Sequence, residues 1–183
     1  DPDRVGTPQT PGNQSIRGLL ANLGHTNEPN GLLWILLVLV GFTLGIGAAV
    51  VAHRAGQELL ALSLVGMTSC AISPMAWGHH WVWFVPLILI AVVAASDRAR
   101  RDRPATWVWW LAPAVITTGT LAWRFRVAFN GEMVWRTGSF RVFWDPSAEG
   151  GSAVLAAIGS ASYLILFAAT IAVCLGWAVR TDP

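Results

Sequence analysis

The sequence contains no lysine, and charged residues occupy only 12% of its 183 positions. Soluble domains carry about 25% charged residues, so an ordinary soluble domain is not expected. The 12 basic residues are all arginines, scattered too widely to follow a phosphate backbone, and we expect no nucleic-acid partner. Hydrophobic residues make up 54% of the chain, which excludes intrinsic disorder. The composition is that of a membrane protein.

Cysteine is also scarce, and the chain begins without methionine. Cys70 and Cys174 both lie in apolar runs, where they are expected to be buried small hydrophobes rather than parts of a disulfide framework. The start at Asp1 has no signal-peptide pattern. Because residues 1–30 are polar and resemble the end of a loop, we expect the chain to be a piece of a longer protein.

Uncharged apolar runs predict about five membrane-spanning helices, since a helix satisfies its own backbone hydrogen bonds in lipid. The expected fold class is therefore all-α, a polytopic integral membrane bundle. Residues 1–30 are predicted to form an extracytoplasmic loop with a short interfacial helix, and residues 31–183 the membrane domain. The expected spans are about 31–52, 59–73, 81–96, 105–123 and 152–179, with an outer loop at 124–151.

The density of arginine predicts the orientation of these spans. The short segments 53–58, 97–104 and 180–183 hold 6 Arg in 18 residues. The remaining connections, 1–30, 73–81 and 124–151, hold 6 Arg in 67 residues. Because short arginine-dense loops stay in the cytoplasm, the first set is expected inside and the second outside.

The first candidate site is the polar segment 12–20, ahead of the first span. Asn13 or Ser15 is positioned to cap a short helix whose apolar stripe would lie in the interface. In the functional interpretation the start of this helix faces an anion, Arg17 pairs with it, and the amides of Asn13 and Gln14 bind a sugar.

The second candidate site is the turn 73–81, where Pro74 interrupts a long apolar run. His79 and His80 lie between Trp77 and Trp81. Paired histidines can bind a phosphate, relay a proton or ligate a metal. Adjacent side chains on a helix point about 100° apart, and no further Cys/His group completes a site, so we expect no metal. One histidine is expected to face a cleft and the other to cap or pack.

The third candidate site is the outer loop, where arginine alternates with aromatic residues from Arg124 and Arg126 onward. This pattern suits phosphate or head-group contacts. A loop that merely rests on the membrane explains it equally well.

The segment Asn13-Gln14-Ser15 followed by Ser73-Pro74-Met75-Ala76-Trp77-Gly78-His79-His80 resembles a pair of motifs in one family. The chain looks like the C-terminal half of the polyprenol-phosphate-mannose-dependent α-1,2-mannosyltransferases, glycosyltransferase family 87, of the GT-C fold. The resemblance implies an inverting, metal-independent transfer of mannose outside the cytoplasm. The donor would be polyprenyl-phosphate mannose, the acceptor a glycolipid of the phosphatidylinositol mannoside or lipomannan type, and no cofactor is expected.

The resemblance also implies roles for the candidate residues. His79 and His80 would contact the donor phosphate, and the segment 13–17 would line the donor or acceptor cleft, with Trp77 and Trp81 beside it. The general base would be an aspartate upstream of Asp1, so the catalytic residues of this chain are unknown. The chain would then be inactive alone, and its partners would be membrane lipids, donor, acceptor and the N-terminal half of the same enzyme.

A non-catalytic membrane module, such as a transporter half or a lipid-binding subunit, is the alternative. A transporter is disfavoured because the predicted spans hold no Asp, Glu, Lys or Arg at mid-membrane, where coupling residues are expected.

Overall fold

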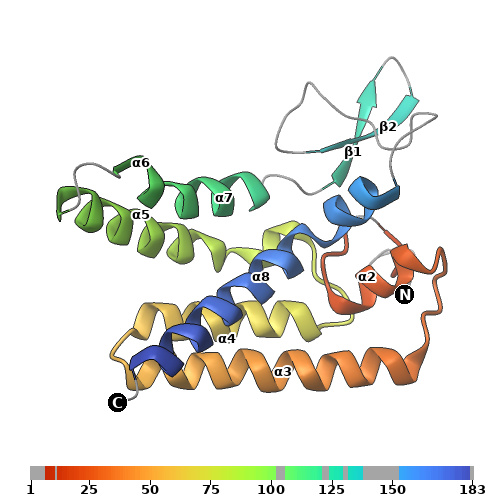
Figure 1. Cartoon of the computed structure of the whole chain (residues 1–183). Coiled ribbons are helices and arrows are strands. Elements are labelled where there is room, and N and C mark those ends of the chain that lie inside the picture. The colour runs from red at the N-terminus through yellow and green to blue at the C-terminus, as the bar shows by residue number, and fades with distance from the viewer. Residues whose placement is uncertain are drawn as a thin grey trace.

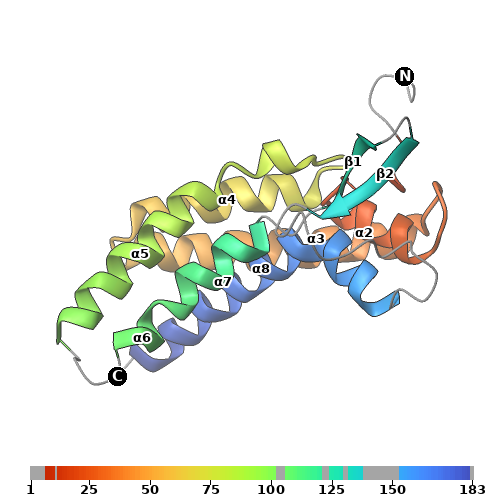
Figure 2. The same ribbon diagram turned by 90° about the horizontal axis from the view of Figure 1, so that it is seen from above.

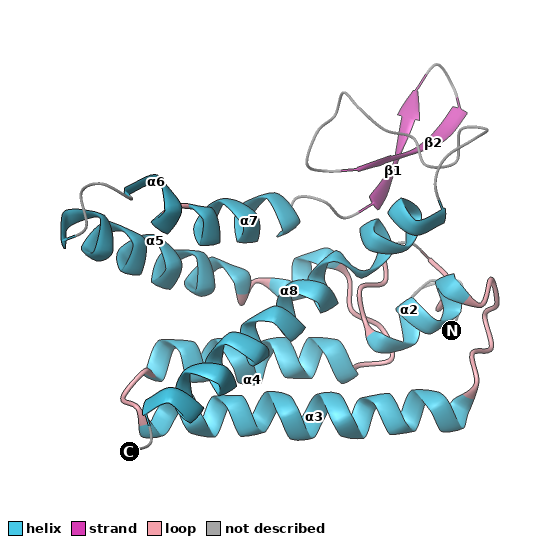
Figure 3. Cartoon of the chain, viewed as in Figure 1, coloured by secondary structure: helices cyan, strands magenta, loops and turns pink. Residues whose placement is uncertain are grey.

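Helices dominate the computed structural model, which describes residues 7–10, 12–101, 106–120, 124–129, 132–137 and 153–181 (Figures 1 and 3). The elements in chain order are α2 (Ile16–Leu23), α3 (Gly31–Arg54), α4 (Glu58–Ile72), the 3₁₀ turn η1 (Gly78–Trp81), α5 (Phe84–Arg101), α6 (Thr106–Trp109), α7 (Leu111–Thr120), β1 (Arg124–Phe129), β2 (Glu132–Thr137) and α8 (Ala153–Thr181).

Helix α3 is long and apolar enough to cross a membrane. Its first turn is capped by Asn30, whose Oδ1 accepts a hydrogen bond from the Leu33 N–H at 3.0 Å. At 1.5 Å per residue it measures about 36 Å, more than the hydrocarbon core of about 30 Å. Leucines along it are exposed, Leu32 by 69%, and the helix formed by residues 78–101 passes the same length and composition test. So much apolar surface on long helices indicates a membrane protein.

Small residues allow α3 to pack closely against α4 and α8. The buried positions of α3 are Gly45, Ala48, Ala49 and Ala52. They recur three or four residues apart, which places them on one face of the helix. Close approach through small residues is the usual way in which membrane helices associate, because lipid provides no hydrophobic drive between them. Figure 1 shows α3 and α4 side by side, with α8 crossing them.

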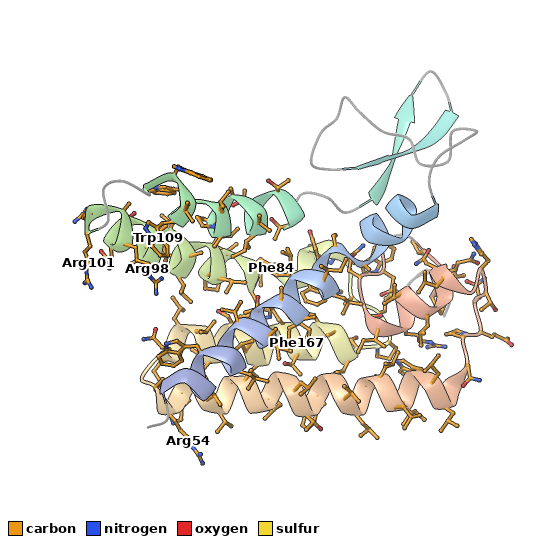
Figure 4. All side chains as sticks on the ribbon, viewed as in Figure 1. Arg54, Phe84, Arg98, Arg101, Trp109 and Phe167 are labelled. Atoms are coloured by element: carbon orange, nitrogen blue, oxygen red, sulfur yellow. The ribbon has the colours of Figure 1, made fainter. Side chains whose placement is uncertain are left out.

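The second layer contains α5 with α6 and α7 alongside it, and α8 lies against α7 in both views (Figures 1 and 2). An aromatic cluster of the core lies where η1 meets α8. The Trp81 and Phe84 rings stack with centroids 5.5 Å apart, and Tyr163 and Phe167 contact Trp81 edge-on at 5.6 and 6.3 Å. Phe84 and Phe167 are labelled in Figure 4. This aromatic cluster fixes the start of α5 against α8.

Several predicted elements are confirmed. The helix expected at 31–52 continues to Arg54, and the pair expected at 59–73 and 81–96 occurs as α4 and α5. Helix α5 begins later than expected, at Phe84, and continues to Arg101, so the described part of the expected loop 97–104 is helical. The turn between them starts where Pro74 prevents Ser73 from remaining helical, since Ser73 has φ −59° and ψ 144°. The last expected helix, 152–179, occurs as α8. Among the described residues, two helices pass the test for a membrane crossing, and the total of five spans stays a prediction.

The span expected at 105–123 was predicted wrongly as one helix. It is divided at Trp110 into α6 and the ten-residue α7, each too short to cross a bilayer. Pro113 lies in the first turns of α7, where its missing N–H does least harm, so a helix begins anew just before it. Hydropathy measures how apolar a run is and does not register where its helix breaks.

The all-α prediction also needs a correction within the expected outer loop 124–151. Its first part forms an antiparallel hairpin, with pairs running from Arg124↔Thr137 to Phe129↔Glu132. The sequence of β1, Arg-Phe-Arg-Val-Ala-Phe, has the alternation typical of a strand. The chain is therefore mostly helical, with one two-stranded ribbon among its described residues.

The small-residue packing gives a direct test at two glycines of α3. A Cβ at Gly45 would overlap the Thr68 hydroxyl and lie 3.0 Å from Phe167 Cζ, whereas no described atom lies within 4 Å of a Cβ at Gly47. We expect Gly45→Ala to destabilise the protein by about 1–3 kcal/mol through overpacking. Gly47→Ala should be neutral or stabilising by up to about 1 kcal/mol. Thermal unfolding of both variants in one detergent measures the difference, and equal midpoints would contradict the described packing.

Candidate functional site in the turn between α4 and α5

The turn at residues 73–77 leaves backbone groups that it cannot satisfy by itself. Ser73 bonds locally, with its Oγ donating to the Met75 carbonyl at 2.8 Å. The carbonyl of Pro74 and both backbone groups of Ala76 need partners from elsewhere. Ala76 is buried, so water cannot supply them.

Asn13 supplies most of these partners. Its Oδ1 accepts a hydrogen bond from the Ala76 N–H at 3.0 Å, and its Nδ2 donates to the Pro74 carbonyl at 3.3 Å. The next residue, Gln14, donates its backbone N–H to the Ala76 carbonyl at 2.8 Å. Asn13 also pairs with Trp77 as an antiparallel bridge. The two polar segments recognised in the sequence, 60 residues apart, are thus one hydrogen-bonded unit.

Ser15 and Gln14 extend this unit to neighbouring helices. Ser15, one of the two predicted candidates, is the N-cap of α2, because its Oγ accepts from the Gly18 N–H at 3.1 Å. The same hydroxyl donates to the Pro74 carbonyl at 3.4 Å. Gln14 Oε1 accepts from the Tyr163 N–H of α8 at 3.4 Å. Asn13, Gln14 and Ser15 are all 0% exposed, so their side chains contact only other parts of the protein and not the solvent.

The two histidines are exposed on η1, and their environments differ. His80 Nδ1 accepts a hydrogen bond from the Trp77 N–H at 3.1 Å, so that nitrogen is unprotonated and neutral His80 carries its proton on Nε2. The His79 ring lies edge-on to the His80 ring, with centroids 4.3 Å apart. One histidine was expected to cap or pack and the other to face a cleft. The first part is found, because His80 caps the turn.

A small cavity of about 240 Å³ lies beside this turn. It is lined by Ser69, Cys70, Ser73, Met75, Ala76 and His80. Sequence reasoning missed the contribution of Ser69 and Cys70. The available signal was their spacing of four and three residues before Ser73, which places them at the same end and face of α4. The cavity is lined by His80, the capping histidine, rather than by His79.

Three other candidate residues, Trp81, Trp77 and Arg17, differ in their burial and in their contacts. Trp81 is only 2% exposed and belongs to the aromatic core, which corrects its expected position beside the cleft. Trp77 packs against the backbone of Gly12, where a Cβ would lie 2.8 Å from Trp77 Cζ3. The Arg17 guanidinium lies over the Trp34 ring, 5.3 Å from its centre. Arg17 and Trp77 are partly exposed, whereas Trp81 acts through packing.

Two remaining expectations concern groups that the structure describes only in part. The strand β1 contains Arg124 and Arg126, but their side chains lie outside the described part of the chain. Among the residues whose side chains are described, no three of the His, Cys, Asp and Glu side chains gather closely enough to hold a metal ion.

Comparison with known proteins shows what this chain is similar to. Residues 1–74 match the family model of glycosyltransferase family 87. This range includes the 13–17 segment and ends at Pro74, just before the histidines. This part of the chain is similar to glycosyltransferase family 87. The resemblance inferred from the two motifs is thereby confirmed.

Curated relatives match over a larger part of the chain. One is the "polyprenol-phosphate-mannose-dependent alpha-(1-2)-phosphatidylinositol mannoside mannosyltransferase" of Mycolicibacterium smegmatis, 36% identical over 103 residues, which cover 52% of this chain and 23% of the relative. Another is the corresponding pentamannoside mannosyltransferase of Mycobacterium tuberculosis, 32% identical over 146 residues, covering 75% of this chain and 30% of the relative. The chain thus spans less than a third of these relatives. No solved structure matches it significantly.

The hydrogen bonds of Asn13 predict a large effect of Asn13→Ala on stability. The substitution leaves the buried Ala76 N–H without its partner, at about 1–3 kcal/mol for an unsatisfied buried group, whereas the Pro74 carbonyl keeps the Ser15 hydroxyl as a donor. Asn30→Ala is the matched control, because Asn30 caps α3 at an exposed position. Its loss should be about 1 kcal/mol.

Unfolding midpoints of the two asparagine variants in the same detergent provide the measurement. Equal losses would show that Asn13 contributes no more than an ordinary helix cap.

Proposed function

We propose that this chain is the C-terminal part of a membrane enzyme that transfers mannose from a polyprenyl-phosphate donor to a glycolipid acceptor. The acceptor class is that of phosphatidylinositol mannosides or lipomannan. The observation that carries this proposal is the direct bonding of Asn13 and Gln14 to the turn at Pro74 and Ala76. A family that shares two distant motifs has a physical reason to keep both when they form one unit. The match of residues 1–74 to glycosyltransferase family 87 supports the same conclusion.

The proposed roles follow from exposure and bonding. His79, His80 and Arg17 have side-chain surface available to a ligand, and we propose that they contact the phosphate of the donor. With Nδ1 held by the Trp77 N–H, His80 offers Nε2–H as a donor. Donors fixed in advance stabilise the charge that develops on a leaving phosphate. Asn13, Gln14 and Ser15 are positioning residues, since they are fully buried.

The reaction requires a base that this unit does not provide. The acceptor hydroxyl oxygen forms a bond to C1 of mannose while the bond from C1 to the donor phosphate oxygen breaks, and the polyprenyl phosphate leaves with the electron pair. A general base must take the hydroxyl proton. We propose that an aspartate outside these 183 residues is this base, which agrees with a chain that spans less than a third of its relatives. No metal or cofactor is required.

We propose that the end of the bundle bearing this site faces away from the cytoplasm. The labelled arginines Arg54, Arg98 and Arg101 gather at the other end (Figure 4). Short connections rich in arginine are retained on the cytoplasmic side. We propose that the protein lies in the cell membrane as a multi-pass protein.

Single cysteines test this orientation. The native Cys70 and Cys174 are buried and can be replaced by alanine to remove background labelling. In such a protein, His79→Cys should react with a membrane-impermeant maleimide added to intact cells. Arg54→Cys should react only after the cells are opened. The reverse pattern would place the site in the cytoplasm and remove the proposed function.

Substitution of the histidines tests the phosphate contact in the complete enzyme. His79→Ala and His80→Ala should each lower mannose transfer in membranes by about a hundredfold, a common loss when one preorganised donor is removed. The matched control is His53→Ala, because His53 is exposed at the opposite end and pairs with Glu58 at 2.8 Å. Transfer is measured from polyprenyl-phosphate mannose to phosphatidylinositol mannosides.

The unfolding midpoint of each histidine variant accompanies the assay, because His80 also caps the turn. A loss of transfer with an unchanged midpoint supports direct contact. Near-normal transfer in both His79→Ala and His80→Ala would remove the phosphate role and favour a non-catalytic membrane module.

A further inference from the structure

A second, larger cavity lies toward the arginine-bearing end of the bundle. Its volume is about 710 Å³, within the range of about 300–1,000 Å³ typical of ligand sites. Helices α5, α7 and α8 form most of its wall, with the ends of α3 and α4 closing one side. The wall is mainly aliphatic, including Leu60, Leu87, Ile90, Val115 and Leu166.

Two of the more polar lining groups are already bonded to the protein. The Thr170 hydroxyl donates to the Leu166 carbonyl at 2.8 Å, and Cys174 Sγ donates to the Ala48 carbonyl at 3.4 Å. The other two, Gln57 and Arg98, are exposed, and so they lie where the cavity reaches the surface. The cavity is therefore apolar inside, with a cation and an amide at its rim.

Arg98 is held in place at this rim. Its guanidinium lies over the Trp109 ring, 5.3 Å from the ring centre, and both residues are labelled in Figure 4. Such a contact limits the freedom of the side chain without neutralising its charge. Trp177 also lines the cavity, and tryptophan is typical of the level where lipid head groups begin.

The charge around the rim is positive. The arginines described at this end are Arg54, Arg98, Arg100 and Arg101. The described carboxylates near them in sequence are Glu58, which bonds to His53, and the exposed Asp97. An anion at the mouth of the cavity would therefore meet a surplus of arginine, at the depth where anionic lipids place their phosphates.

We propose that this cavity binds an anionic phospholipid, with an acyl chain between α5, α7 and α8 and the phosphate at Arg98. The aliphatic wall provides a place for the chain, and the guanidinium pairs with the phosphate through charge-assisted hydrogen bonds. The site is at the opposite end of the bundle from His79 and His80, so it is separate from the proposed sugar-transfer site. It does not depend on mannose transfer.

The first test uses purified protein in a neutral detergent, with phosphatidylglycerol as the anionic probe and phosphatidylcholine as the neutral one. Native mass spectrometry should detect bound phosphatidylglycerol at a Kd at least tenfold below that of phosphatidylcholine. Arg98→Gln should weaken phosphatidylglycerol binding at least fivefold. Arg100→Gln is the matched control, because Arg100 lies on the same helix but does not line the cavity, and it should change binding less than twofold.

Several outcomes would overturn the proposal. Equal affinity for the two lipids would show that the head-group charge is not recognised. Equal losses in Arg98→Gln and Arg100→Gln would show diffuse attraction to the arginine-rich end. Filling the cavity with Ala91→Phe should also weaken binding, and unchanged binding in that variant would place the lipid elsewhere.

A measurement on the unmodified chain covers the case in which the variants fail to fold. Phosphatidylglycerol with a photoreactive diazirine in its acyl chain should label peptides from 87–98, 111–116 and 166–177. Labelling confined to the outward leucines of α3 would show ordinary lipid contact and contradict a bound lipid.

Discussion

The side-chain amide of Asn13 is the interaction on which the functional end of this protein depends. Pro74 ends α4 and forces the chain into a turn whose backbone groups have no helical partners. In a buried setting every such group left unpaired is costly. An asparagine amide has a donor and an acceptor side by side, which match the carbonyl of Pro74 and the N–H of Ala76. Together with the Gln14 N–H and the Ser15 hydroxyl, this amide fixes the position of the turn and of the histidines that follow.

Burial of this amide gives the segment 13–15 a positioning role in the site that we propose. The hydrogen bonds described for the side chains of Asn13, Gln14 and Ser15 are made to other groups of the protein. They join the N-terminal segment to the turn and to α8, and the aromatic cluster around Trp81 secures the same junction by packing. The exposed groups, His79 among them, therefore lie on a surface that is fixed both by these hydrogen bonds and by the aromatic cluster. Preorganisation of this kind is what a site needs in order to stabilise developing charge.

The sequence predicted those features that depend on local chemistry. The length of α3, the Ser15 cap and the break at Pro74 follow from apolar runs, capping and the stereochemistry of proline. What it did not predict depends on tertiary packing. Tryptophan is a residue type typical of the membrane interface, yet Trp81 is in the core, where its ring packs against Phe84 and Tyr163. The division of 105–123 and the hairpin after it were missed because hydropathy carries no information on helix continuity or strand pairing.

The two ends of the bundle differ in the polar groups that they expose, and the difference lies in where the arginines are placed. At the end bearing the turn, polarity comes from hydrogen-bonded backbone groups and the two histidines, and the adjacent cavity is small and partly polar. At the other end it comes from arginines around a large aliphatic cavity. Arginine cannot lose its charge and is drawn to anionic lipid. In the orientation that we propose, the arginines that would hold a lipid at Arg98 would also retain that end in the cytoplasm, with the histidine turn on the opposite face.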